Sequence, residues 1–199
     1  MNEVKLKLQI FFDYIDSLSE DIKESIYDYS SELGYHSELN EIMREYKDLN
    51  GHYKLIYKDL MFAFDNAPKL TDTITLYRGS DRFLNTDFNL NYFYSTSYDS
   101  NQALKFVEND NFLYVITCTP GNYSLLPIER ISESPSEFEV ILPPKGRFSI
   151  QKEVRKQDSI YNVPTIYITY IPETAIIVDT KKAIITDEKI IEMFKKTFL

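Results

Sequence analysis

The chain changes character once along its length, and this change limits the folds open to it. Up to about residue 66, apolar residues recur at helical spacing, as Leu6, Ile10 and Tyr14 do. From Thr73 onward, short runs rich in Ile, Tyr, Phe, Val and Thr alternate with polar turns, which is typical of strands. Helices followed by strands predict an α+β domain with an antiparallel or mixed sheet.

Capping residues give approximate limits to these elements. Ser19 and Ser37 are suitable N-caps, and Gly34 suits the position that follows a helix. Either Asp99 or Ser100 can cap a short helix among the strands. The expected helices span 3–17, 20–33, 37–49, 52–66, 100–108 and 187–197, and the expected strands span 74–78, 92–97, 112–118, 138–142, 146–154, 163–171 and 174–179.

Length and charge limit the domain organisation and the partners. The 199 residues fit one domain, with a helical N-terminal part over 1–66 and a mainly β core over 73–199. A formal net charge of −9 disfavours a nucleic-acid partner, which would be held through its phosphates. No stretch approaches the uncharged length of a membrane span, and the N-terminus lacks the apolar core of a signal peptide. We therefore expect a monomer without membrane contact, either cytoplasmic or delivered into a host cell without a cleaved signal peptide.

The sequence gives little support for a site built on cysteine or histidine side chains. Cys118 is the only cysteine, so an internal disulfide and a cysteine-based metal cluster are excluded, and its strand-like surroundings indicate a buried, inert thiol. The two histidines, His36 and His52, both fall in the helical part, which argues against a Ser–His triad or a zinc site. With five glycines in all, the chain has no glycine-rich phosphate loop.

Two glutamates, Glu137 and Glu139, stand at the entry to an apolar run that predicts a strand. Side chains at i and i+2 of a strand leave the same face, so both carboxylates should point into one space while Phe138, Val140 and Leu142 face the other way. Carboxylates that close repel each other, and folding alone gives no reason to pair them. A site for cationic or electron-poor groups gives such a reason. The alternative is two exposed carboxylates at a strand end.

Two further groups of residues can carry chemistry. Arg78 closes a predicted strand and Gly79 follows it, which puts a guanidinium where the backbone can approach a ligand closely. Ser95 and Ser97 should share one strand face, with Thr96 on the other, and such small hydroxyls leave room for a ligand and can orient a carboxylate. Each group alone has a plain structural alternative, a solvated strand end for the arginine and a polar edge strand for the hydroxyls.

The order of these groups along the chain is more specific than any one of them. Arg-Gly at the end of one strand, Ser-Thr-Ser on the next, and then Glu-x-Glu-Val-Ile-Leu-Pro resembles the mono-ADP-ribosyltransferases with an arginine, Ser-Thr-Ser and Glu-x-Glu signature. That class includes bacterial toxins and vertebrate ecto-enzymes. The resemblance covers roughly residues 50–155 and includes the turn over 143–148. It implies an ADP-ribosyltransferase-like β-sandwich core, mixed or antiparallel, with an N-terminal helical layer.

The resemblance implies an NAD site. Arg78 would contact the NAD phosphates and ribose, and Gly79 would offer backbone hydrogen bonds to the nicotinamide carboxamide. Phe106 would lie against the nicotinamide ring, or else be a core phenylalanine on an amphipathic helix. The residues assigned to NAD in this way are Arg78, Gly79, Ser95, Thr96, Ser97, Phe106 and Glu139.

The same resemblance implies catalytic roles for Glu139, Glu137, Ser95 and Arg78. Breaking the bond between nicotinamide and ribose leaves an oxocarbenium ion, which a Glu139 carboxylate bonded to the ribose 2′-hydroxyl would stabilise. Ser95 would hold that carboxylate in place. Glu137 would bind the guanidinium of an acceptor arginine and accept its proton. In the family, glutamate rather than glutamine at this position goes with arginine acceptors.

The chain departs from the family pattern at two places. Relatives often carry an aromatic residue in the loop before the glutamates, whereas the loop over 130–136 here is polar apart from Ile131 and Pro135. Some relatives also place a second phosphate-binding arginine after the position of Phe106. Residues 107–110 here contain none, which leaves the NAD phosphates to Arg78 and backbone groups unless Lys105 or Arg82 contributes.

Together these features predict an arginine-specific mono-ADP-ribosyltransferase that uses NAD as substrate and no metal. Its partner would be a target protein presenting an arginine, and the helical residues 1–66 would pack against the NAD cleft. Two alternatives stay open, an NAD glycohydrolase that sends the ribosyl cation to water and a non-catalytic NAD-binding module. The setting fits a phage or viral enzyme, or a bacterial toxin or effector.

Overall fold

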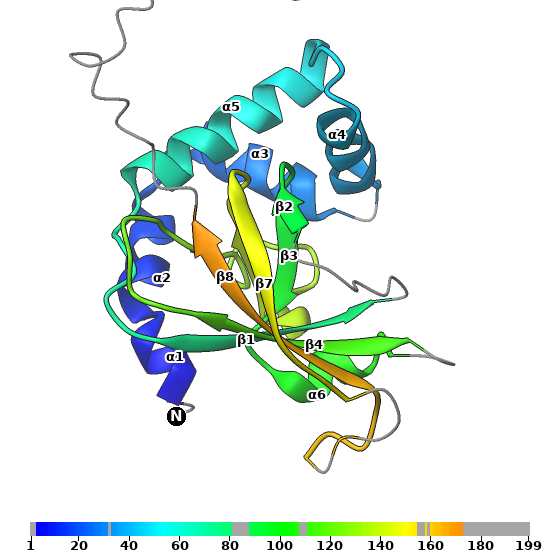
Figure 1. Cartoon of the computed structure of the whole chain (residues 1–199). Helices are drawn as coiled ribbons and strands as arrows, with labels where there is room; N and C mark the ends of the chain where they lie inside the picture. The colour runs from blue at the N-terminus through cyan, green and yellow to red at the C-terminus, as the bar shows by residue number, and fades with distance from the viewer. Residues whose placement is uncertain are drawn as a thin grey trace, which may run out of the picture.

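Five helices come first in the chain, and in Figure 1 they lie along the left and across the top of the strands that follow. The structure, a computed structural model, describes residues 3–31, 33–80, 88–107, 111–154, 158 and 160–172. The helices are α1 (Glu3–Lys7), α2 (Gln9–Ser17), α3 (Glu20–Ser30), α4 (Tyr35–Arg44), α5 (Gly51–Asn66) and α6 (Ser100–Leu104), with a 3₁₀ turn, η1 (Pro135–Glu137), late in the chain.

Eight strands form one hydrogen-bonded sheet in the order β2-β7-β8-β4-β1-β3-β6-β5. The pair β4–β8 is parallel and the other neighbours are antiparallel, so the sheet is mixed. The α+β class with a mixed sheet is thereby confirmed. The strands are β1 (Ile74–Ser80), β2 (Phe88–Leu90), β3 (Tyr94–Ser97), β4 (Phe112–Cys118), β5 (Leu126–Pro127), β6 (Glu139–Leu142), β7 (Gly146–Val154) and β8 (Thr165–Pro172).

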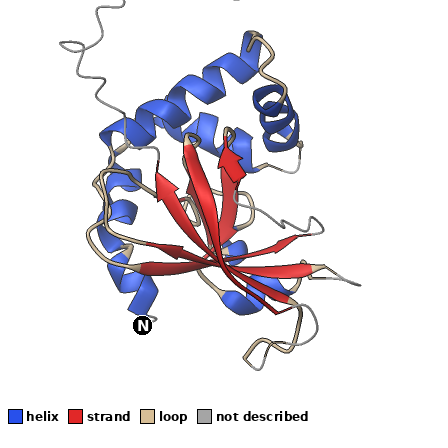
Figure 2. Cartoon of the chain, in the orientation of Figure 1, coloured by secondary structure: helices blue, strands red, loops and turns tan. Residues whose placement is uncertain are grey.

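The sheet divides between β1 and β3. Strand β1 pairs with β4 along its whole length, but its register with β3 is the single pair Tyr77↔Ser97. One wing therefore holds β2, β7, β8, β4 and β1, and the other holds β3, β6 and β5. Figure 2 shows the strands spreading from a common crossing region, with helices around the outside.

The main core lies where the two wings face each other. Tyr94 on one wing contacts Phe148 on the other, with ring centroids 5.0 Å apart. Leu142 and Phe148 are fully buried in the same cluster, and complete burial of each such side chain contributes about 1.5–3 kcal/mol relative to exposure. Helix α2 closes this core with Phe11 and Phe12. These contacts match the predicted sandwich-like core.

A second core joins the helical layer to the three-strand wing. Phe93, immediately before β3, stacks on Phe64 of α5 at 5.9 Å and meets Tyr29 of α3 edge-on at 5.7 Å. The Phe93 backbone N–H also donates to Asn40 Oδ1 of α4 at 3.1 Å. The helical layer is thus fixed directly to the strand that carries the Ser-Thr-Ser sequence.

Several predicted helix limits are wrong. The helix expected over 37–49 already ends at Arg44, and the helix expected over 100–108 ends at Leu104.

Gly34 does not follow the helix before it, which ends at Ser30; it is instead the N-cap of α4, with φ at +82°. Glycine adopts that left-handed conformation without steric penalty. Ser37 consequently lies inside α4 and does not begin it. The expected single helix over 3–17 is also divided at Leu8 into α1 and α2.

Two other cap positions are confirmed. Ser19 occupies the N-cap position of α3, but its side chain makes no capping hydrogen bond. Asp99 caps α6 by accepting hydrogen bonds from the backbone N–H groups of Asn101 and Gln102. Strands β2 and β5 were not predicted, because two or three residues carry no periodic pattern. The expected strand over 174–179 and the helix over 187–197 lie outside the described residues.

The helices within the described ranges are too short or too polar to cross a lipid bilayer.

Candidate active site

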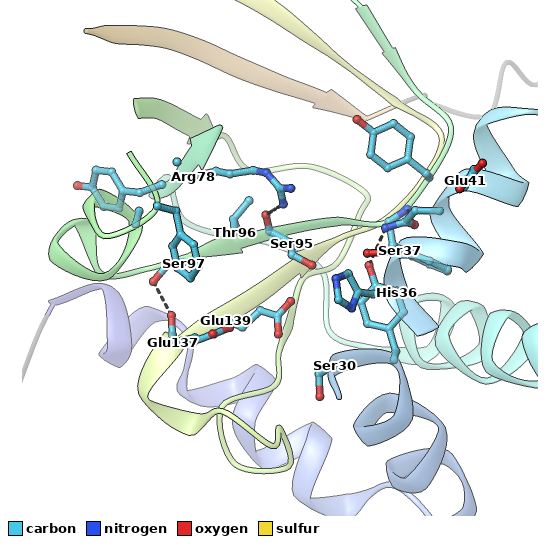
Figure 3. A pocket seen from close by; sticks show the side chains of 18 of the residues that line it. Ser30, His36, Ser37, Glu41, Arg78, Ser95, Thr96, Ser97, Glu137 and Glu139 are labelled. Atoms are coloured by element: carbon cyan, nitrogen blue, oxygen red, sulfur yellow. Dashed lines mark hydrogen bonds between the residues drawn. The ribbon is translucent and has the colours of Figure 1, made fainter. Parts of the chain in front are cut away.

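A cavity of about 420 Å³ lies between the sheet and the helical layer (Figure 3). Its sheet side brings together all the residues that the sequence singled out: Arg78, Gly79, Ser95, Thr96, Ser97, Phe106, Glu137 and Glu139. Its helical side adds residues that the sequence did not point to, chiefly Tyr29, His36, Asn40 and Arg44.

Arg78 reaches across the division between the two wings. It leaves β1 just after the single β1–β3 pair and donates from Nη1 to the carbonyl oxygen of Ser95 on β3 (Figure 3). Its guanidinium carbon lies 4.5 Å from the ring centroid of Tyr94, within the range of a cation–π contact. The arginine is therefore held in one orientation with its charge at the cavity.

Gly79 allows the end of α6 to approach β1 closely. A Cβ atom at this position would lie 2.7 Å from both the Ala103 carbonyl oxygen and the Phe106 Cβ. Any side chain would push this segment away and displace Phe106 from the cavity wall. Phe106 is 53% exposed, so the alternative of a core phenylalanine is wrong.

The hydroxyls of Thr96 and Ser97 fix the strand that carries Glu139. Thr96 Oγ1 donates to the Val140 carbonyl at 2.6 Å, and Ser97 Oγ donates to the Glu137 carbonyl at 2.7 Å. The Ser97 hydroxyl also accepts from the Asp99 backbone N–H at 3.1 Å. These bonds tie β3 to β6 and to the turn before β6, beyond the backbone ladder between the two strands.

Glu139 is a buried carboxyl group, 8% exposed, at the start of β6. Burial raises its pKa to about 7, because desolvation disfavours the charged form. A hydrogen bond from Ser95 acts in the opposite direction, the nearby Glu137 charge raises the pKa further, and the Arg78 charge lowers it. With a pKa of about 7, the carboxyl group gains or loses its proton near neutral pH.

Glu137 does not lie on the strand, so the same-face prediction for the two glutamates is wrong. It is the last residue of η1, and Phe138 then takes a left-handed conformation with φ at 51° and ψ at 43°. Two features account for this: Pro135 starts the 3₁₀ turn, and the left-handed conformation of Phe138 lets its ring pack on the distant Tyr98, with ring centroids 5.3 Å apart. Both glutamates still line the cavity, but a turn and not a strand brings Glu137 there.

A hydrogen-bonded chain from the helical layer ends at Ser95. Asn40, held by the Phe93 backbone, donates from Nδ2 to the Tyr29 hydroxyl at 3.2 Å. The Tyr29 side chain in turn interacts with Ser95, which also interacts with the Glu139 carboxyl group. Burial raises the Tyr29 pKa to about 12, so this hydroxyl stays neutral. No sequence signal pointed to this role of Asn40, because the residues four positions before and after it, a histidine and an arginine, are polar as well.

Arg44 supplies a second guanidinium to the cavity. Its guanidinium carbon lies 4.2 Å from the Tyr92 ring centroid, and the Tyr92 and Tyr94 rings are 6.1 Å apart. Two arginines, Arg44 and Arg78, therefore lie on neighbouring tyrosine rings. Arg44 Nε is buried and has no hydrogen-bond partner among the described residues. An unpaired buried donor is costly, so it favours an anionic ligand at this place.

Arg44 comes from the helical layer and not from the segment after Phe106 where a second arginine was sought. Lys105 bonds Gln102 Oε1 at 2.7 Å and is not part of the cavity wall. Arg82 lies outside the described residues.

His36 contributes a neutral ring to the cavity wall. Burial lowers its pKa, and the positive charge of Arg78 lowers it further. Both causes disfavour the imidazolium. Within the described part of the chain, no group of three or more His, Cys, Asp or Glu side chains is placed to hold a metal ion.

Comparison with protein-family models identifies a match. The family model for NAD:arginine ADP-ribosyltransferase matches residues 10–163, a span that contains both walls of the cavity. No curated protein sequence is significantly similar to the chain.

Solved structures with a similar fold include ADP-ribosyltransferases. One from Clostridium botulinum has a TM-score of 0.65 at 18% identity, with 85% of this chain and 96% of that chain covered. An ADP-ribosyltransferase toxin from Paenibacillus larvae has a TM-score of 0.67 at 18% identity, covering 84% and 94%. Exoenzyme S from Pseudomonas aeruginosa, in complex with human 14-3-3 protein beta and bound to carba-NAD, has a TM-score of 0.61 at 12% identity, covering 92% and 94%.

Proposed function

The chain belongs to the NAD:arginine ADP-ribosyltransferase family, and from this premise we propose that it transfers ADP-ribose from NAD to an arginine of a target protein. Nicotinamide is the other product. The observation that carries the proposal is the meeting of Arg78, Ser95, Glu137 and Glu139 at one cavity of about 420 Å³. These residues come from three strands and a turn, and no folding requirement explains two carboxylates and an arginine around the same space.

NAD binding falls to the two arginines. Guanidinium groups bind phosphate oxygens well because their donors form a planar fork. The unpaired Nε of Arg44 and the oriented guanidinium of Arg78 together suit a diphosphate. Exoenzyme S, which has a similar fold, binds carba-NAD, which supports a dinucleotide in the corresponding cavity here. Gly79, Thr96, Ser97 and Phe106 would shape the nicotinamide end of the cavity.

Cleavage of the glycosidic bond falls to Glu139. The bond between the nicotinamide nitrogen and ribose C1′ breaks, its electron pair leaves with nicotinamide, and positive charge develops on the ribose. The Glu139 carboxylate stabilises that charge, and it does so with little reorganisation because Ser95 holds it. Tyr29 and Asn40 support Ser95 from the helical layer.

Acceptor recognition falls to Glu137. An arginine nitrogen of the target attacks C1′ and loses one proton, which Glu137 accepts or passes to solvent. A carboxylate at this position complements a guanidinium, which supports arginine as the acceptor. Its place on a turn, and not within the paired strand, leaves room for a protein surface to reach the cavity.

The test uses NAD with and without agmatine, a small molecule that ends in a guanidinium. We expect a mono-ADP-ribosylated agmatine product by mass spectrometry, formed together with nicotinamide. Nicotinamide and ADP-ribose without an agmatine product would indicate an NAD glycohydrolase instead. NAD binding by calorimetry without nicotinamide release would indicate a non-catalytic module. Incubation with a cell lysate, followed by mapping of the modified residue, then identifies the target protein.

A further inference from the structure

Glu129 lies near the start of the loop that joins β5 to β6 and carries Glu137 near its end. We call residues 128–138 the acceptor loop. Its base is closed by backbone bonds: Pro127 pairs with Val140 across β5 and β6, and the Ile128 N–H donates to the Glu139 carbonyl at 3.0 Å. Glu129 is therefore the first loop residue beyond a fixed base.

The Glu129 carboxylate is buried and held on both oxygens. Glu129 is 8% exposed. Lys5 Nζ of α1 lies 2.6 Å from its Oε1, and the Tyr98 hydroxyl donates to its Oε2. A helix at the very start of the chain and the residue that follows β3 thus meet at one carboxylate. Glu129 is not part of the cavity wall, so it is placed to act on other residues and not on NAD.

Tyr98 connects this carboxylate to the end of the acceptor loop. Its backbone N–H donates to the Phe138 carbonyl at 3.2 Å, and its ring lies 5.3 Å from the Phe138 ring. The residue before it, Ser97, donates to the Glu137 carbonyl. A continuous set of contacts therefore runs from Lys5 through Glu129 to the backbone that presents Glu137.

We propose that Glu129 is a positioning residue for the acceptor: held by Lys5 and Tyr98, it fixes the acceptor loop and so the direction of Glu137. This inference rests on the role proposed for Glu137. An ion pair with one partly exposed partner, as Lys5 is here, adds little net stability, so what this pair adds is a defined loop conformation. It governs transfer to the acceptor and leaves cleavage of NAD to Glu139.

The chain offers a matched control on the same helix. Lys7 also lies on α1, but it pairs with Glu3 at 2.8 Å, four residues away, and not with the acceptor loop. Lys5→Met and Lys7→Met therefore remove the same charge from one helix with different expected results. Lys5→Arg keeps the charge and serves as the conservative rescue.

Two rates are measured for each variant, agmatine modification and nicotinamide release without acceptor. In Lys5→Met we expect kcat/KM for agmatine to fall about tenfold, because misplaced reacting groups lose rate steeply. Nicotinamide release should stay within about twofold of the original protein, since ground and transition states of that step are untouched. Lys7→Met should match the original protein on both rates, and Lys5→Arg should recover most of the transfer.

Hydrogen exchange gives a readout that does not depend on the acceptor. Peptides covering 128–138 should exchange faster in Lys5→Met than in Lys7→Met, with β1 and β4 unchanged. If Lys5→Met does not fold, Glu129→Gln replaces it, because the glutamine oxygen can still accept from Tyr98 while the charge pair is lost.

Equal loss of transfer and nicotinamide release in Lys5→Met would overturn the proposal, and so would unchanged exchange in the acceptor loop. If the original protein modifies no agmatine, the proposal that the acceptor is an arginine is wrong. The hydrogen-exchange comparison between Lys5→Met and Lys7→Met then decides alone whether Glu129 positions the acceptor loop.

Discussion

Glu139 and Glu137 stand two residues apart in the chain but belong to different kinds of structure. Glu139 begins a strand that is paired on both sides, is 8% exposed and interacts with Ser95. Glu137 ends a 3₁₀ turn, is half-buried and is held through its backbone carbonyl. The rigid position suits a group that acts on one fixed substrate, and the turn suits a group that must meet the surface of a second protein.

The largest effect should come from the glutamate on the strand. Glu139→Gln keeps the shape and removes the charge, so both nicotinamide release and transfer should fall by about 100- to 1000-fold or more. Nicotinamide release by chromatography measures this, with circular dichroism to confirm that the fold is retained. Turnover near that of the original protein in a folded variant would contradict the role given to Glu139.

The glutamate on the turn should separate the two reactions. Glu137→Gln removes the group that binds and deprotonates the acceptor, so modification of agmatine should fall about 100-fold. Release of nicotinamide to water should continue, because Glu139 is intact. Both rates are measured on the same preparation. A parallel loss of both would show that the division of labour between the two glutamates is wrong.

The pH dependence should report Glu139. Since its pKa is raised to about 7 and the charged form is the active one, kcat/KM for NAD should be half-maximal near pH 7. It should fall about tenfold per pH unit well below that value. Ser95→Ala removes a bond that lowers this pKa, so the midpoint should move to higher pH. Glu137→Gln removes a neighbouring negative charge, so its midpoint should move to lower pH. Shifts in the opposite directions would refute this account.

The last effect should be on stability and not on a rate. The pKa of Glu139 in the folded protein, about 7, lies above its ordinary value of 4.5, so the protonated carboxyl favours folding. That contribution is complete below about pH 4.5 and is lost as the pH rises through 7. At pH 8, Glu139→Gln should therefore raise the free energy of unfolding by about 2–3 kcal/mol. Urea denaturation at pH 8 and pH 5 measures this, and a gain of the same size at both pH values would count against buried charge as the cause.

The sheet side of the cavity could be predicted from the sequence. Arg78 follows an apolar run and Glu139 precedes one, and Ser95 lies in the Ser-Thr-Ser sequence after two aromatic residues. The α+β class followed from the change in pattern at Thr73. The strands are local features that neighbouring residues indicate, whereas the common site of these side chains was predicted from their order along the chain and its resemblance to a family.

The helical side could not be predicted in the same way. Arg44 reaches the cavity only because Phe93 packs among α3, α4 and α5, which is a contact between distant segments. Nothing in the pattern around Arg44 distinguishes it from a solvated charge at a helix end. The place of Glu137 was missed for another reason: the left-handed conformation of Phe138 depends on tertiary packing against Tyr98.

Gly79 has a structural role that is separate from any role of Arg78 in the reaction. With 2.7 Å between a Cβ atom there and both Ala103 and Phe106, the glycine is required to seat α6 beneath β1, whatever the arginine beside it does. A related protein that had lost the reaction but kept this packing would still carry glycine at the position of Gly79, even if another residue had replaced the arginine before it. Searches for active members of such lineages should therefore give the glycine little weight and rank chains by the strand glutamate.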